Sequence, residues 1–353
     1  MKNTRKYNRI CVLGGGLWGT ALANHLAHRG SSIRLWEVFP ELAGRLEESR
    51  RHPHIPGLKL SPGIRVTSRL EEAAAEAFAI LVVLPSTAVR QTARALRPLL
   101  DARSARPAIV NASKGVERGS LRTMGEVLIE ELPDLDGRVF TLSGPSFARE
   151  VVRGTPTKLV LAGPSGRLAG ELRALLDGGA IRVEGSLDRT GVELGGSLKN
   201  VIAVGCGILD GLIAAGGAKA QAGAASGSVA QPGANTKAAL IAQGIGEMGR
   251  LIERLGGRRE TIYGLSGLGD LIATGTSPES RNRLLGEKLG SGKSLRRALK
   301  EIPTVAEGVE SAQSAHELLH SCGLRAPLLE AIWGTIHRGR SPRGVLAALG
   351  FLR

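Results

Sequence analysis

A glycine-rich loop between a strand and a helix is the feature that most constrains how this chain folds. A short buried strand is predicted over residues 9–13, the sequence G-G-G-L-W-G follows, and a helix is predicted directly after it. In this G-x-G-x-x-G pattern, Gly14 permits a tight turn, Gly16 lets a pyrophosphate approach the backbone, and Gly19 lets the helix pack closely on the strand. Amides at the helix N-terminus then face the phosphates. The pattern therefore predicts a dinucleotide site.

The second predicted strand, over residues 32–36, ends at Glu37. An acidic residue at this point binds both hydroxyls of the adenosine ribose and repels the 2′-phosphate that distinguishes NADP(H) from NAD(H). Glu37 therefore favours NAD(H) as the cofactor, with NADP(H) as the alternative.

Strands and helices continue to alternate through the first half of the chain. Further strands are predicted over residues 79–84, 108–112, 139–142, 157–162 and 181–183. Alternation of this kind predicts an α/β fold with a Rossmann-like, doubly wound parallel sheet, here over residues 1–187. Ligands of such sheets bind beyond the carboxyl ends of the strands, where Lys114, Gly144 and Ser146 fall. Lys114 either binds a ligand or is an ordinary exposed lysine of a loop.

The second half has a different pattern. The 353 residues are enough for about two domains, and from residue 188 onward apolar helical periodicity replaces the strand signals. Residues 188–353 are therefore predicted to form an all-helical domain. A low-complexity stretch of Gly, Ala, Ser and Gln at about 212–233 is predicted to be an inserted, mobile loop.

Composition narrows the class of protein. A net charge of +15 fits nucleic acid, anionic membranes or anionic small molecules as partners. The charge is scattered, which favours a solvated basic surface, and aromatic residues make up only 3%, so no nucleic-acid partner is expected. No apolar run is judged to approach the ~18 residues of a membrane span, so no membrane insertion is expected. The three separated cysteines indicate reduced thiols and a cytoplasmic protein.

One lysine stands alone in an apolar run. Lys199 lies in E-L-G-G-S-L-K-N-V-I-A-V-G, residues 193–205, which predicts a closely packed helix. A buried lysine loses hydration, which lowers its pKa and suits it to proton transfer. The alternative is a core helix whose lysine extends to the surface.

Two later segments carry polar groups at predicted helix starts. Asp270 follows a glycine-rich turn, where it can charge-pair with Lys199 or cap a helix. In S-P-E-S-R-N-R, Ser277 is predicted to cap a helix that the next proline opens, which places Arg281 and Asn282 near the positive end. Arginine and amide groups there suit a phosphate, although an exposed basic turn explains the same residues.

A zinc-protease pattern also occurs. Residues 316–320 read H-E-L-L-H on a predicted helix, so that both imidazoles share one face. No downstream ligand segment is evident and the other histidines form no supporting cluster, so no metal site is predicted.

A series of motifs points to one family. They are GGGLWGTALA (14–23), LVVLPS (81–86), SKG (113–115), SGPSFA (143–148), VELGGSLKNVIAVG (192–205), NTKAAL (235–240), GLGDL (267–271), SRNR (280–283) and VAEG (305–308). In this order the series resembles the bacterial-type NAD(P)-dependent glycerol-3-phosphate dehydrogenases over nearly the whole chain. No single motif decides the matter.

The resemblance implies reversible reduction of dihydroxyacetone phosphate to sn-glycerol 3-phosphate with NAD(P)H, supplying glycerol phosphate for phospholipids, by a homodimer. It implies that Lys199 exchanges the proton at the carbinol oxygen, with Asp270, Asn200 and Thr274 near the chemistry. The implied substrate contacts are Lys114, Gly144, Ser146, Lys199, Asp270, Ser280, Arg281 and Asn282. The implied cofactor contacts, besides the glycine loop and Glu37, are Leu17, Trp18, Lys114, Ala148, Arg281, Val305 and Glu307.

The chain departs from the family pattern in three places. The segment between Asp210 and Asn235 is roughly 18 residues longer than usual, judged against typical loops. Glu37 stands where many NADPH users have His or Arg, and Leu17 stands where Ser is common. Two other readings remain: another lysine-dependent Rossmann hydroxyacid dehydrogenase, of the 6-phosphogluconate or 3-hydroxyacid type, and a dinucleotide sensor or basic binding protein. Segments 267–271 and 280–283 disfavour the first, and the retained Lys199 disfavours the second.

Overall fold

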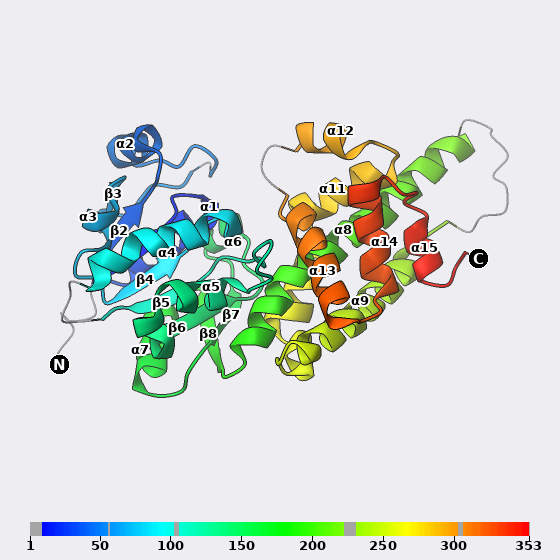
Figure 1. The fold of residues 1–353 in the computed structure, drawn as a ribbon. Coiled ribbons are helices and arrows are strands. Elements are labelled where there is room, and N and C mark those ends of the chain that lie inside the picture. Colours follow the sequence, from blue (N-terminus) through cyan, green and yellow to red (C-terminus); the bar gives the residue numbers. More distant parts are fainter. Residues whose placement is uncertain (1–8, 56, 102–105, 222–230, 303–305, 353) are drawn as a thin grey trace. The chain divides into compact units, whose positions relative to one another are not determined.

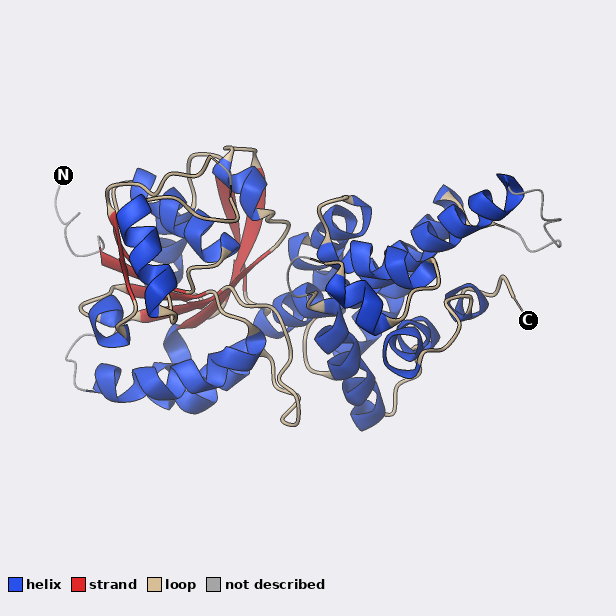
Figure 2. Ribbon diagram, turned by 90° about the horizontal axis from the view of Figure 1, so that it is seen from above, coloured by secondary structure: helices blue, strands red, loops and turns tan. Residues whose placement is uncertain are grey.

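The chain divides into two compact units in the computed structural model, which describes residues 9–55, 57–101, 106–221, 231–302 and 306–352. The first unit comprises Met1–Glu117 and Arg122–Arg189, and the second comprises Arg118–Leu121 and Thr190–Arg353. Among the described residues, every strand of the sheet belongs to the first unit, while the second is built from helices (Figure 2). The predicted class, a Rossmann-like sheet followed by a helical domain, is confirmed.

The sheet of the first unit has eight strands in the order β3-β2-β1-β4-β5-β6-β7-β8 (Figure 1). The strands are β1 (Arg9–Leu13), β2 (Ser32–Trp36), β3 (Ile64–Thr67), β4 (Ala79–Val82), β5 (Ala108–Asn111), β6 (Val139–Ser143), β7 (Thr157–Ala162) and β8 (Ile181–Ser186). All neighbours are parallel except β6 and β7, which pair antiparallel. A parallel return needs a crossover of a dozen or more residues, usually with a helix. Between β6 and β7 the chain forms only the five-residue helix α6, and β7 returns antiparallel beside β6.

Helices cover both faces of this sheet. They are α1 (Leu17–His28), α2 (Pro40–Ser49), α3 (Leu70–Ala74), α4 (Ser86–Asp101), α5 (Met124–Glu131), α6 (Ala148–Val152) and α7 (Arg167–Leu176), with a 3₁₀ turn at Pro133–Arg138. Alternate residues of β1 enter two separate cores: Ile10 and Val12 pack with α1 and α7, and Cys11 and Leu13 pack with α3, α4 and α5. Burial on both faces explains why the strands are almost continuously apolar.

The second unit is a helical assembly around α8 (Arg189–Gln221). Its other helices are α9 (Ala234–Arg254), α10 (Asp270–Thr276), α11 (Arg281–Gly290), α12 (Leu295–Lys300), α13 (Gly308–Cys322), α14 (Pro327–Arg338) and α15 (Gly344–Ala348). A 3₁₀ turn (Arg259–Tyr263) and a π turn (Leu265–Gly269) precede α10. The helical periodicity of the second half therefore predicted its structure correctly.

Helix α8 corrects two sequence predictions. It contains an 18-residue window of mean hydropathy 1.6, so an apolar run of membrane-spanning length does exist; 72% of that window is buried, as in a core helix. The small residues between its apolar ones concealed this run. The helix also continues to Gln221, so the loop predicted from about residue 212 begins as helix, because its alanines favour that conformation. Residues 222–230 of the predicted loop lie outside the described residues.

Helices α8 and α11 touch backbone to backbone. A Cβ at Gly207 would lie 1.8 Å from the carbonyl oxygen of Arg283, and one at Gly286 would lie 1.9 Å from that of Val204. Real Cβ atoms do not approach so closely, so glycine is required at both places. The contact fixes α11, which starts at Arg281, against the helix that carries Lys199.

Candidate active site

The glycine loop of the first unit has the geometry that its sequence predicts. Gly14 has φ of +117°, and a Cβ there would lie 2.2 Å from the carbonyl oxygen of Val83. A Cβ at Gly19, near the start of α1, would lie 2.0 Å from the carbonyl oxygen of Gly14, so this glycine permits the close packing of helix and strand. A Cβ at Gly16 would meet nothing within 4 Å. The loop is thus tight on its inner side and open at Gly16, where α1 begins.

The side chain of Glu37 lies against this loop. A Cβ at Gly15 would be 2.6 Å from Glu37 Oε2, and Glu37 Oε1 accepts a hydrogen bond of 3.1 Å from the amide of Phe39. Glu37 is only 7% exposed. The carboxylate is therefore held beside the loop at the end of β2, the position from which it was predicted to contact a ribose.

A residue that sequence reasoning did not assign, His52, supports the loop from behind. Its Nε2 lies 3.1 Å from the carbonyl oxygen of Gly15, and its Nδ1 accepts a 3.1 Å hydrogen bond from the amide of His54. Because Nδ1 accepts, Nε2 carries the proton and donates to Gly15. Burial lowers the pKa of His52, which favours this neutral form. No local pattern marks His52, because the chain between it and the loop spans β2 and α2.

Three residues predicted at strand ends gather around one carbonyl group. Lys114 Nζ donates to the Gly144 oxygen at 3.4 Å, and Ser146 Oγ donates to the same oxygen at 3.0 Å. Gly144 has φ of +124°, a conformation that favours glycine. Ala148 opens α6 just beyond, while Leu17 and Trp18 are half-buried in the first turn of α1. The carboxyl ends of β5 and β6 thus bring a cation and a hydroxyl together.

In the second unit, Lys199 is buried with two hydrogen-bonding partners from α10. Its Nζ lies 3.0 Å from Asp270 Oδ1 and 2.5 Å from Thr274 Oγ1. The three side chains belong to residues that are 5%, 3% and 5% exposed, respectively. The predicted ion pair between Lys199 and Asp270 is present, and the alternative of a lysine that extends to the surface is wrong. Asp270 is the first residue of α10 and not its cap, because Gly269 occupies that position.

Beside this lysine, two amides and a carboxylate tie three helices together. Asn282 Nδ2 donates to Asn200 Oδ1 at 2.8 Å, and the amide of Gly308 donates to Asn282 Oδ1 at 2.9 Å. Asn200 Nδ2 donates in turn to Glu307 Oε2 at 3.3 Å. The side chain of Asn282, predicted to contact substrate, is therefore engaged at both ends within the protein. Val305, the neighbouring cofactor prediction, lies outside the described residues.

The start of α11 differs from its prediction by one turn. Ser280 caps the helix, since its Oγ accepts a 3.2 Å hydrogen bond from the amide of Arg283, whereas Ser277 Oγ closes a turn with the amide of Glu279 at 3.1 Å. The proline after Ser277 therefore belongs to this turn. The predicted placement of Arg281 at the positive end holds: it is the first helical residue, and it is exposed.

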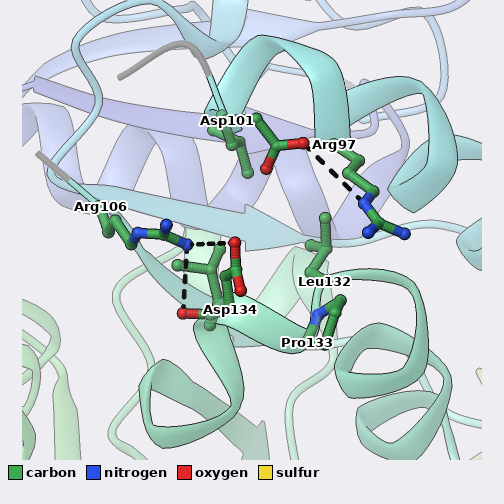
Figure 3. A pocket seen from close by; sticks show the side chains of 8 residues that line it. Arg97, Asp101, Arg106, Leu132, Pro133 and Asp134 are labelled. Carbon is green, nitrogen blue, oxygen red and sulfur yellow. Dashed lines mark hydrogen bonds and ion pairs between the residues drawn. The ribbon is translucent and has the colours of Figure 1, made fainter. Parts of the chain in front are cut away.

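A small hollow elsewhere on the first unit is unrelated to these groups. Figure 3 shows it between α4 and the 3₁₀ turn, where Arg106 Nη1 lies 2.9 Å from Asp134 Oδ2 and Arg97 Nε lies 3.9 Å from Asp101 Oδ2. Its lining contains none of the predicted site residues. Paired charges already account for its polar side chains.

A sheet unit with a glycine loop, joined to a helical unit that buries a lysine with an acid and a hydroxyl, is the construction of a nicotinamide-dependent dehydrogenase. Two family models match the chain: residues 9–169 match the N-terminus, and residues 188–347 the C-terminus, of NAD-dependent glycerol-3-phosphate dehydrogenase. The chain belongs to this family.

Individual relatives agree with this assignment. The chain is 40% identical over 342 residues to a glycerol-3-phosphate dehydrogenase (NAD(P)+) of Nitratidesulfovibrio vulgaris strain DP4, covering 97% of both chains. It is 41% identical over 345 residues to that of Geobacter sulfurreducens, covering 97% of this chain and 96% of the relative. The crystal structure of glycerol-3-phosphate dehydrogenase from Coxiella burnetii superimposes with a TM-score of 0.85 at 33% identity, covering 98% of both chains.

Proposed function

We propose that this chain catalyses the reversible reduction of dihydroxyacetone phosphate to sn-glycerol 3-phosphate with a nicotinamide dinucleotide. The observation that carries the proposal is the buried cluster of Lys199, Asp270 and Thr274 in a chain of this family. The bound dinucleotide supplies hydride to the carbonyl carbon of the substrate. Through glycerol 3-phosphate, the reaction would supply the backbone of phospholipids.

Lys199 is the proposed acid and base. In the direction of reduction, its ammonium donates a proton to the carbonyl oxygen as negative charge develops there; in oxidation, the neutral amine removes the hydroxyl proton. Asp270, 3.0 Å away, offsets the cost of burying the ammonium and orients it. Thr274 Oγ1, at 2.5 Å, limits the directions in which Nζ can point.

The substrate phosphate is proposed to bind at the start of α11. Arg281 provides an exposed guanidinium, and it lies at the positive end of the α11 dipole, which favours an anion. Asn282 contributes by position, because its side-chain amide holds Asn200 and the start of α13. In the first unit, Lys114, Gly144 and Ser146 remain proposed substrate groups.

The finer proposals concern the cofactor and the assembly. NAD(H) is favoured over NADP(H) because Glu37 is fixed beside the glycine loop and would repel a 2′-phosphate. The neighbouring residues 38 and 39 are Val and Phe, which offer no positive charge. A homodimer in the cytoplasm is proposed from the family resemblance and from the three cysteines, which are not joined in disulfides.

Oxidation of NADH and NADPH with dihydroxyacetone phosphate, followed side by side, tests the reaction and the preference together. NADH should be the better substrate, and Glu37→Gln should narrow the difference because it removes the repelling charge. Glu41→Gln, an exposed acid on α2, is the matched control and should leave the ratio unchanged. A higher rate with NADPH in the unaltered enzyme would reject the preference but not the reaction.

Lys199→Ala tests the acid and base. Turnover should be lost while NADH still binds, as followed by fluorescence titration, because the glycine loop and Glu37 in the first unit are unchanged. Lys300→Ala removes an exposed lysine and should leave turnover unchanged. Substantial activity in Lys199→Ala would remove Lys199 from the mechanism. Absence of activity with either dinucleotide in the unaltered enzyme would favour a hydroxyacid substrate.

A further inference from the structure

Helices α13 and α14 bring two imidazoles and a carboxylate together on the second unit. His316 and His320 are four residues apart on α13, and their ring centroids are 4.4 Å apart. Glu330, on α14, places Oε1 2.8 Å and Oε2 3.0 Å from His316 Nδ1. One ligand atom from each of the three residues can be chosen so that all lie within 4.8 Å of one another. The sequence showed no third ligand for this H-E-x-x-H segment, because Glu330 comes from the next helix.

The central imidazole of the cluster is held in a fixed plane. The ring of His316 stacks on the indole of Trp333 with centroids 3.5 Å apart and an interplanar angle of 5°. Trp333 Nε1 donates to Gln313 Oε1 at 2.9 Å, which fixes the indole in turn. Packing of this kind fixes the rotamer of a ligand before an ion binds.

The hydrogen bond between His316 and Glu330 accounts for the positions of these two side chains without a metal ion. This hydrogen bond does not involve His320, which is exposed on the same face of α13. With His320, the cluster offers two nitrogen ligands and one oxygen ligand. Imidazole and carboxylate together suit zinc and its neighbours in the first transition row, whereas magnesium and calcium prefer oxygen ligands alone.

We propose that His316, His320 and Glu330 bind one divalent transition-metal ion of the zinc class, with water completing the coordination, and that the ion joins α13 to α14. The site is structural and is separate from the proposed reaction. It is also distinct from that of the zinc proteases, in which the glutamate of the motif acts as the general base, because Glu317 Oε1 here accepts a 2.7 Å hydrogen bond from Gln313 Nε2.

Binding of Zn²⁺ and Co²⁺ to the whole, chelator-treated chain tests the site. Calorimetry should show one Zn²⁺ per chain, and Zn²⁺ should raise the melting temperature. His320→Ala and Glu330→Gln should each weaken binding by about tenfold or more. Glu317→Gln is the matched control from the same motif, and His28→Ala removes an exposed histidine elsewhere; neither should change binding. Circular dichroism would verify that each variant is folded.

Three results would overturn the proposal. One is the absence of saturable Zn²⁺ binding in the unaltered chain. Another is binding that both His320→Ala and Glu330→Gln leave unchanged. The third is a thiolate-to-metal absorption band with Co²⁺, since the proposed ligands include no cysteine and Cys322 would then be the ligand.

Discussion

Replacing Asp270 by asparagine should destabilise the second unit, because it leaves the ammonium of Lys199 buried without a counter-charge. The two residues are 5% and 3% exposed, and Nζ lies 3.0 Å from Oδ1. Removing one partner of such a pair costs about 3–5 kcal/mol. The loss of stability has an upper bound, because the buried lysine of the variant can instead lose its proton. From an ordinary pKa of ~10.4, this costs about 4.6 kcal/mol near pH 7, at 1.36 kcal/mol per pH unit.

The stability of Asp270→Asn should depend on pH. In Asp270→Asn, burial would hold the folded-state pKa of the lysine below its unfolded value, so the unfolded chain would bind more protons and stability would rise with pH. The upper bound on the loss shrinks to about 1.9 kcal/mol near pH 9. Urea unfolding followed by circular dichroism, at about pH 7 and pH 9, measures both quantities.

Two further variants complete the experiment. Replacing both partners, as Lys199→Met with Asp270→Asn, should destabilise by less than the sum of the single changes, because no uncompensated charge remains. Asp136→Asn, an exposed acid of the first unit, is the control. A loss below about 1 kcal/mol for Asp270→Asn, or a loss independent of pH, would refute the claim that the pair is charged and buried.

Contacts at Arg281, Gly286 and His52 can be tested in the same way. Arg281→Ala should lower kcat/KM for dihydroxyacetone phosphate by roughly 30-fold or more, from a lost charged contact of about 2–5 kcal/mol; an unchanged KM would remove it from the phosphate site. Gly286→Ala should separate α8 from α11 and reduce both the melting temperature and turnover. Gly246→Ala is the control, because a Cβ at this position of α9 has room; Gly292→Ala would not serve, because the φ of Gly292 is +91°. Burial lowers the pKa of His25 and of His52 in the folded protein. The stability that they contribute is therefore complete above their unfolded pKa of ~6.5 and is lost as the pH falls through their folded pKa values. His52→Gln should make the urea midpoint depend less on pH.

Local sequence patterns predicted most of the first unit. The loop at Gly14 to Gly19 leaves little freedom, because two of its glycines are required by backbone contacts that any such strand and helix would make. Buried strands can be recognised in the sequence as short apolar runs. The antiparallel pairing of β6 with β7 could not be predicted, because the connection at residues 144–156 is long enough for either direction and the short helix after Phe147 carries little periodic signal.

The candidate site was harder to predict where contacts span long stretches of chain. The pair of Lys199 and Asp270 could be anticipated from charge in apolar surroundings. The support that His52 gives to the glycine loop, and the approach of Glu330 to His316, depend on how helices pack, and no spacing along the chain encodes them. Helix caps fall between these cases: Ser277 and Ser280 both fit the cap pattern, and only the fold distinguishes them.

The backbone contact between α8 and α11 has a consequence for substrate scope. Because no side chain separates Gly207 from Arg283 or Gly286 from Val204, no rotamer change can widen the gap between the two helices. The span from the ammonium of Lys199 to the first turn of α11 is therefore a set length in this protein. We expect the enzyme to discriminate by the number of bonds between the carbonyl and the phosphate of its substrate. Phosphorylated ketones with one more carbon between these two groups should be poorer substrates than ketones that are altered on the other side of the carbonyl.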